Sequence, residues 1–250
     1  MLALCLLIAD VAASDKLTEV RTKAQRGDVQ AQLHLASAYL NGRGVPQDYA
    51  ESARWYRRAA EQGDPRAQLV LGTVYEDGKG VLQNFTEAAK WYRKAADHGL
   101  PAAQLCLGGL YRDGHGVPKD YSEAAKWFRK AAEQGDLAAQ SNLGRLYASG
   151  HGVRQDYAEA AKWYREAAEQ GEPKAQLLLA GLYTAGRGVP QDYVGAYKWY
   201  SLAAARATDS DTRDRATDGR DLAAARMSST SIAEAQEQAR EWTEKGQQAH

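Results

Sequence analysis

The sequence predicts an all-α protein, a solenoid of helix-turn-helix repeats with a helical cap at each end. First, nearly the same string occurs at 114–136, "GHGVPKDYSEAAKWFRKAAEQGD", and at 150–172, "GHGVRQDYAEAAKWYREAAEQGE". Second, the glycine that opens this string lies at positions 42, 78, 114, 150 and 186, so the period is 36 residues. A fixed period of this size is typical of a repeat array, in which each unit buries its apolar face against its neighbours.

The charges of the chain balance. Lys and Arg together number 32, as do Asp and Glu, which gives a formal net charge of zero at pH 7. This balance offers no electrostatic basis for binding nucleic acid or an anionic membrane, so we expect neither as a partner. The hydrophobic fraction of 44% is close to that of ordinary globular proteins and predicts a folded chain.

Residues 1–13, "MLALCLLIADVAA", predict a secretory signal peptide, because an apolar run is followed by Val11 and Ala13 before Ser14. No basic segment precedes the run, so an apolar N-terminal tail is the alternative. A signal peptide predicts a periplasmic or secreted protein, and a tail predicts a cytoplasmic one. No later stretch reaches the roughly 18–20 apolar residues that span a bilayer, so we expect no transmembrane span.

Residues 14–30 are expected to form an N-terminal capping helix, and five repeats follow over 31–206. Each repeat is expected to hold a first helix, helix A, and a second helix, helix B. Pro101 suits the first turn of helix A, where its missing N–H costs nothing, and Gly114 suits the end of that helix. Asp120 and Glu123 have the spacing of a capping box at the start of helix B, and Gly135 suits its end.

Aromatic residues recur at four positions of the repeat. They are Tyr39, Tyr75, Tyr111, Tyr147 and Tyr183 in helix A, and three sets in helix B: Tyr49, Phe85, Tyr121, Tyr157 and Tyr193; Trp55, Trp91, Trp127, Trp163 and Trp199; and Tyr56, Tyr92, Phe128, Tyr164 and Tyr200. A ligand-binding aromatic has no reason to recur in every copy, whereas a packing aromatic does. We therefore interpret these residues as packing between neighbouring repeats.

The alternation of "AQLCLGGLYRDGHGV" with "DYSEAAKWFRKAAEQGD" closely resembles the Sel1-like repeat family, relatives of the tetratricopeptide repeats. The resemblance covers five copies and implies a right-handed superhelix of helix pairs whose helices A line a concave groove. It also implies a scaffold that holds other proteins. The fifth copy departs from the pattern at Gly195, Ser201 and Ala207, as the end of an array should.

Residues 207–250 are expected to form a C-terminal helical cap. Four residues of its last helix fall on one helical face and are expected to pack on the array. They are Ile232, Ala235, Ala239 and Trp242.

Comparison of the copies with one another separates the constant core of helix A from a face that varies. The varying residues are predicted to line a groove that binds a partner, although a solvated face that changes without constraint would look the same. The predicted groove residues are Ser37, Asn41, Thr73, Glu76, Asp77, Arg112, Asp113, Arg145, Ser149 and Thr184.

A second set of residues is basic or titratable in every copy and lies between the two glycines of "GxGV". It consists of Arg43, Lys79, His115, His151 and Arg187. A cation just beyond a helix C-terminus is stabilised by the helix dipole, which explains the regularity without a partner. The alternative is a basic edge that binds an acidic segment. His115 and His151 are one repeat apart, too far to share a metal whose ligands lie about 2 Å away, so no metal site is predicted.

Catalysis is not predicted. The chain holds no Ser-x-x-Lys, no "GxSxG" and no P-loop. We expect a monomeric scaffold without a cofactor that binds another protein or peptide. Two alternatives are open: a hydrolase of the β-lactam type that the family resemblance implies for some members, and a binder of cell-wall glycan or peptide.

Overall fold

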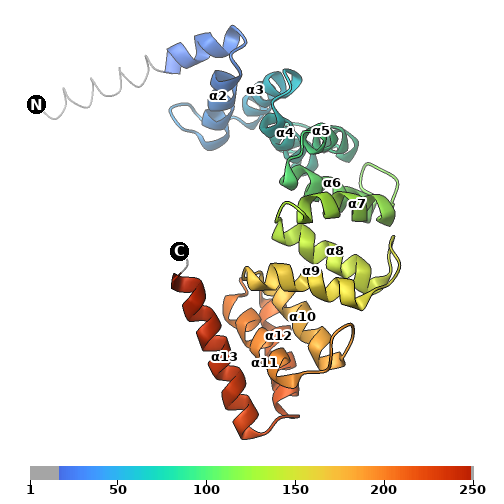
Figure 1. Cartoon of the computed structure of the whole chain (residues 1–250). Coiled ribbons are helices and arrows are strands. Elements are labelled where there is room, and N and C mark those ends of the chain that lie inside the picture. Colours follow the sequence, from blue (N-terminus) through green and yellow to red (C-terminus); the bar gives the residue numbers. More distant parts are fainter. Residues whose placement is uncertain (1–16, 249–250) are drawn as a thin grey trace, which may run out of the picture. The chain divides into compact units, whose positions relative to one another are not determined.

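A computed structural model describes residues 17–248, with side chains through residue 245 (Figure 1). Every element of this part of the chain is an α-helix, which confirms the predicted all-α class. Helix α1 is described over residues 17–25 and is followed by α2 (Val29–Asn41), α3 (Tyr49–Glu61), α4 (Pro65–Asp77), α5 (Phe85–Asp97), α6 (Pro101–Asp113), α7 (Tyr121–Ala132), α8 (Leu137–Ser149), α9 (Tyr157–Glu169), α10 (Pro173–Ala185), α11 (Tyr193–Arg206), α12 (Ser210–Ala224) and α13 (Ser229–Gln248).

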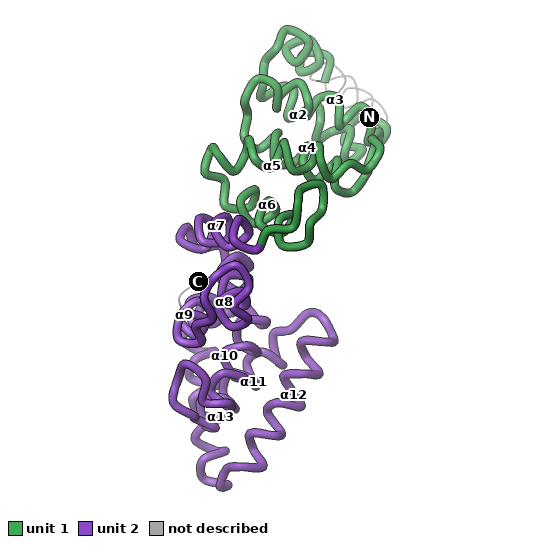
Figure 2. The backbone as a smooth tube through the Cα atoms, turned by 90° about the vertical axis from the view of Figure 1, so that its right-hand side faces the viewer, with its two compact units in different colours: residues 1–120 green, residues 121–250 purple. Residues whose placement is uncertain are grey.

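The chain divides into two compact units, residues 1–120 and 121–250 (Figure 2). Helices α1 to α6 belong to the first unit, and α7 to α13 belong to the second. The even-numbered helices α2 to α10 are helices A, and the odd-numbered helices α3 to α11 are helices B. Within each unit a helix A packs on the helix B that follows it, and that helix B packs on the next helix A. The predicted signal peptide, residues 1–13, lies outside the described residues, as do residues 14–16 of the predicted capping helix.

One leucine position forms the centre of each repeat. Its members are fully buried at 0% exposure, and they are Leu35, Leu71, Leu107, Leu143 and Leu179. Around this position, the ring of Tyr92 rests on Gly72, where an added Cβ would lie 2.5 Å from the ring, and Tyr164 rests on Gly144 in the same way. Both rings therefore pack on helix A of their own repeat. Tyr200 of the same set lies against Gly219 of α12, beyond its own repeat, so this aromatic position makes contacts both within a repeat and with the element that follows it.

Helix A begins and ends as its sequence indicates. Asp28, Asp64, Asp136 and Glu172 each accept a hydrogen bond from the backbone N–H three residues later, which caps the helix. In α6 the same position is Leu100, which makes no side-chain cap. Each helix A then ends at a glycine in the left-handed conformation, with φ between 63° and 78°.

Helix B has an N-cap, but the second half of the predicted capping box is replaced by other contacts. The Asp48 side chain accepts from the N–H of Glu51 at 3.0 Å, as a cap should. The Asp48 N–H, however, donates to the carbonyl of Tyr39 at 2.9 Å, and the Glu51 carboxylate pairs with Arg54. The same exchange occurs in α9, where Asp156 N–H donates to Tyr147. The capping-box prediction is therefore wrong in this half, because helix A supplies the acceptor.

The second glycine of "GxGV" is required by a close approach between repeats. Gly152 has φ of 70°, and an added Cβ would overlap the backbone of Tyr121 at the start of the preceding helix B. Gly80, Gly116 and Gly188 are equally close to the preceding helix B. Gly44 has φ of 73°, and no described residue lies within 4 Å of such a Cβ.

Helices α12 and α13 follow the fifth repeat and pack on α11. Ala235 is fully buried, and Ile232, Ala239 and Trp242 pack against the core of the second unit. The Trp242 ring meets Trp199 of α11 edge-on, with centroids 6.1 Å apart. None of the described helices is both long and apolar enough to cross a membrane.

Candidate functional site

The predicted groove residues all lie in the second half of a helix A, and we call them the variable face. Ser37 and Asn41 belong to α2, and the others follow on α4, α6, α8 and α10. The exposed members are Asn41, Thr73, Asp77, Asp113, Arg145 and Ser149, and the half-buried members are Ser37, Glu76, Arg112 and Thr184. The variable face is therefore accessible in each unit. Whether its helices line a concave groove stays a prediction.

On α4 the variable face is tied to helix B of the same repeat. The hydroxyl of Tyr92 donates to Glu76 Oε2 at 2.5 Å and lies 3.2 Å from Thr73 Oγ1. Burial of the ring raises the pKa of Tyr92 well above its ordinary value, and Cys106 and Glu76 add to this rise. Glu76 is therefore held in one place as an acceptor.

The charges at the end of helix A are paired locally in the first unit. Arg112 donates twice to the Asp113 carboxylate, from Nε at 2.8 Å and from Nη2 at 2.7 Å. This fork lowers the pKa of Asp113, although partial burial opposes the effect. Asp77 pairs with Lys79 at 2.8 Å. A partner that uses these groups must compete with existing contacts.

The second unit presents a less constrained charge. Arg145 is exposed and makes no ion pair with the described residues. Ser149 Oγ donates to the Arg145 carbonyl at 2.9 Å, and Thr184 Oγ1 donates to Ala180 at 2.9 Å. These two hydroxyls are used within their own helices, so Arg145 is the strongest candidate for a contact with a partner in this unit.

Three members of the predicted basic edge lie on aromatic rings of the preceding repeat. The His115 ring lies 4.9 Å from Phe85, and the His151 ring stacks on Tyr121 with centroids 4.7 Å apart. Arg187 lies over Tyr157 at 5.4 Å from the ring centroid. These contacts join the turn of one repeat to the start of helix B in the repeat before it. The helix dipole alone therefore does not account for the set.

A buried glutamine, which sequence reasoning did not single out, joins helix B to the next helix A. Each member donates from Nε2 to the backbone carbonyl eight residues before it, at 3.1–3.3 Å. The members are Gln32, Gln68, Gln104, Gln140 and Gln176. Each of these carbonyls also accepts from the backbone N–H of the glycine three residues later, so the glutamine adds a second donor at the end of helix B. The signal was the "AQ" pair at the start of every helix A.

An arginine and a tyrosine form a second link between consecutive helices B and A. Arg21 donates to the Tyr39 hydroxyl at 2.9 Å, and Arg165 donates to Tyr183 at 3.0 Å. The same bond links Arg57 to Tyr75, Arg93 to Tyr111 and Arg129 to Tyr147. The tyrosines were predicted to pack between repeats, but their hydroxyl partners were not predicted. A constant separation of 18 residues was the available signal.

Neither the variable face nor the basic edge resembles a metal centre. No group of three or more His, Cys, Asp or Glu side chains in the described part of the chain is arranged to hold a metal ion. The two surfaces offer polar and charged groups spread along successive helices, an arrangement that suits contact with an extended partner.

Comparison with known proteins places this repeat in a family. A protective antigen present in uropathogenic Escherichia coli strains, with an SLR fold, is 34% identical with a TM-score of 0.74; the match covers 92% of this chain and 56% of the antigen. A Sel1 repeat protein from Oxalobacter formigenes is 36% identical with a TM-score of 0.73, over 81% of this chain and 86% of that protein. The chain therefore spans about half the length of the antigen. No curated protein matches it.

The family model that matches is the Sel1 repeat. Its five matches run end to end over residues 29–64, 65–100, 101–136, 137–172 and 173–207. They cover more than half of the chain, and the similar structures carry the same helical repeats. The predicted helical-repeat solenoid is thereby confirmed, and the chain belongs to the Sel1 repeat family.

Proposed function

We propose that the protein is an interaction scaffold that binds another protein or peptide through the variable face, as a monomer and without catalysis or a cofactor. One observation carries this proposal. The five helices A share the same fully buried leucine, whereas the residues of the variable face differ between copies in charge and in hydrogen-bonding groups. A constant frame with differing accessible residues suits an array that fits an irregular partner surface.

Photo-crosslinking tests this function. A benzophenone side chain is placed at Thr73 in the first unit or at Arg145 in the second, and the controls carry it at Arg54 or Lys126 on helices B. All four positions are exposed. We expect a discrete adduct with one protein from the variable face and none from the controls. Adducts of equal yield from all positions, or none from the variable face, would contradict the proposal.

Once that partner is purified, a substitution measures the contribution of the variable face. Arg145→Ala should weaken binding by about 1–3 kcal/mol if the guanidinium is a desolvated anchor. The melting temperature should stay unchanged, because the side chain is exposed and makes no ion pair with the described residues. Arg54→Ala, on the exposed side of α3, is the matched control and should leave binding unchanged. Equal affinities of wild type and Arg145→Ala would remove this residue from the interface.

We also propose that the protein acts in the periplasm or outside the cell. The apolar run of residues 1–13 supports this location, and the similar solved structures come from bacteria. The N-terminus of the protein recovered from the periplasm or the medium should begin at Ser14. Recovery from the cytoplasm with Met1 or Leu2 at the N-terminus would overturn the proposal.

A further inference from the structure

One of the five tryptophans of helix B differs from the others in exposure. Trp55, Trp91, Trp127 and Trp199 are buried, with 5–9% of each residue exposed. Trp163 of α9 occupies the same position but is half-buried. The fold of the repeat is the same, so the difference must come from the side chains around this ring.

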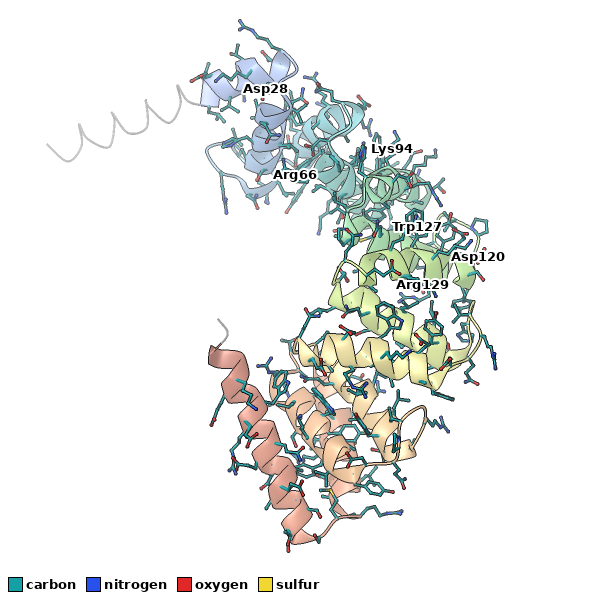
Figure 3. All side chains as sticks on the ribbon, in the orientation of Figure 1. Asp28, Arg66, Lys94, Asp120, Trp127 and Arg129 are labelled. Carbon is teal, nitrogen blue, oxygen red and sulfur yellow. The ribbon has the colours of Figure 1, made fainter. Side chains whose placement is uncertain are left out.

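In the first three repeats a cation covers the tryptophan. Lys94 Nζ lies 4.0 Å from the centroid of the Trp91 ring, and Lys130 Nζ lies 4.0 Å from that of Trp127. Lys94 and Trp127 are labelled in Figure 3. Arg58 covers Trp55 at 4.5 Å. Each cation comes three residues after its tryptophan, one helical turn further along the same face. The sequence thus repeats one built-in cation–π pair three times.

In α9 this position is Glu166, an acid in place of the cation. A carboxylate is repelled by the electron-rich face of an indole ring, so Glu166 cannot cover Trp163 as Lys130 covers Trp127. No cation lies over Trp163 among the described residues. In the fifth repeat the cover is restored by other means, since Lys198 and Trp242 contact the Trp199 ring.

The change also inverts the charge of helix B around this ring. Helix α5 carries three basic and two acidic residues, whereas α9 carries two basic and three acidic ones. Glu159, one turn before Trp163, already pairs with Lys162. Glu166 is exposed and makes no ion pair with the described residues, so an unpaired negative charge lies one helical turn after Trp163.

We propose that Trp163 and Glu166 form a docking point for a lysine or arginine side chain on a segment of a partner protein. The incoming cation would take the place that Lys130 takes over Trp127, about 4 Å from the ring centroid, and would pair with Glu166. The chain's own repeats provide the precedent for the geometry, and the acid provides the complementary charge. This surface lies on helix B and is separate from the variable face of helices A.

The site discriminates by charge. A basic segment gains both the cation–π contact and the ion pair, whereas an acidic segment meets Glu166 with a like charge. The pairing of both groups in one place favours a basic peptide segment over an apolar one. A second copy of this chain, which carries many exposed lysines and arginines, is the competing occupant.

The test is a selection of peptides on the purified full-length chain. A phage-displayed library of random twelve-residue peptides is selected on the wild type and counter-selected on Glu166→Lys. In that variant an internal lysine should cover Trp163, as Lys130 covers Trp127. We expect enriched peptides that contain Lys or Arg, and synthetic versions should bind Glu166→Lys at least about tenfold more weakly. Circular dichroism should show the same helicity for both chains.

A reciprocal variant keeps the test independent of folding defects. Lys130→Glu recreates the acid at Trp127, so the selected peptides should bind this variant at two sites. Failure to enrich any peptide, or enrichment of peptides without basic residues, overturns the proposal. A wild-type dimer that Glu166→Lys dissolves in sedimentation assigns the site to a second copy and overturns it as well. Crosslinking from position 145 should persist in Glu166→Lys. The experiment therefore distinguishes a failure of the docking point at Trp163 from a failure of the binding proposed for the variable face.

Discussion

At the scale of single residues, helix caps differ between otherwise equal repeats. Leu100 is at the N-cap of α6, where the other helices A have a carboxylate that accepts from a backbone N–H. Leu100→Asp should therefore raise the free energy of unfolding by about 0.5–1.5 kcal/mol, because it supplies the missing acceptor at the positive end of the helix. Urea unfolding followed by circular dichroism measures the change.

The reverse substitution is the matched control. Asp136→Ala removes an existing cap in α8 and should lower the free energy of unfolding by about 1 kcal/mol. If Leu100→Asp is neutral while Asp136→Ala is destabilising, the α6 N-terminus does not need a side-chain acceptor.

The second glycines of "GxGV" allow two destabilising effects of a Gly→Ala substitution to be measured separately: the cost of the left-handed backbone conformation and the cost of steric overlap. Gly44 and Gly152 both have φ near 70°, but among the described residues only Gly152 faces the backbone of the preceding helix B. Gly44→Ala should cost about 1–2 kcal/mol for the left-handed conformation alone. Gly152→Ala should cost a further 1–3 kcal/mol, roughly, for the overlap. Equal losses of stability in thermal unfolding would show that the overlap at Gly152 adds no cost.

At the scale of elements, substitutions at the tryptophan position measure how much each helix B contributes to the stability of the protein. Trp127 is 5% exposed, whereas Trp163 is half-buried. Trp127→Ala should lower the free energy of unfolding by about 3–5 kcal/mol, and Trp163→Ala should cost clearly less, because less apolar area leaves the core. Chemical unfolding of both variants provides the comparison. A loss at Trp163 as large as that at Trp127 would contradict the assignment of an uncovered ring.

Helix positions were predictable because their signals are local. A proline in the first turn, as in Pro101, and a glycine with positive φ at the end, as in Gly114, act within one helix and are visible in one copy of the repeat. The contacts between helices were less predictable. The Asp48 N–H finds the Tyr39 carbonyl only because helix A lies beside it, and no spacing within helix B reveals that neighbour.

For the candidate site, the sequence predicted which residues are accessible but not which side chains they contact. The variation between copies identified residues that are accessible in the structure, such as Arg145. It could not reveal that Arg112 is held by its neighbour Asp113 or that Glu76 accepts from Tyr92, because those pairs depend on rotamers and on a second helix. The contact between the His115 and Phe85 rings was hidden for the same reason, since the two residues meet only across a repeat junction.

At the scale of the whole molecule, buried tyrosines set the response to alkali. Burial raises the pKa of Tyr56, Tyr92 and Tyr164 above the ordinary 10.0. The unfolded chain therefore loses these protons first, so their contribution to stability is complete below pH 10 and decreases as the pH rises further. The free energy of unfolding should fall steeply above about pH 10.

Phenylalanine variants assign this loss to individual rings. Tyr92→Phe and Tyr164→Phe should each reduce the slope of stability against pH by about 1.4 kcal/mol per pH unit above pH 10. Phe128 already occupies the same position in the third repeat, so the fold accepts the change. Urea unfolding at pH 8 and pH 11 gives both slopes. Parallel slopes for wild type and variants would show that other groups control alkaline unfolding.

The bond between an arginine and the tyrosine 18 residues later is the same at each described junction within a unit, beginning with Arg21 and Tyr39. The next members of the series would be residues 201 and 219, and the chain has Ser201 and Gly219 there. If a segment of 36 residues were duplicated or deleted as a whole, the newly joined helices would again form the hydrogen bond between arginine and tyrosine. Recombination between copies would change the number of repeats without requiring any new interface. Among the described junctions, the one after the fifth repeat lacks this pair, so an added repeat would fit before that junction but not after it.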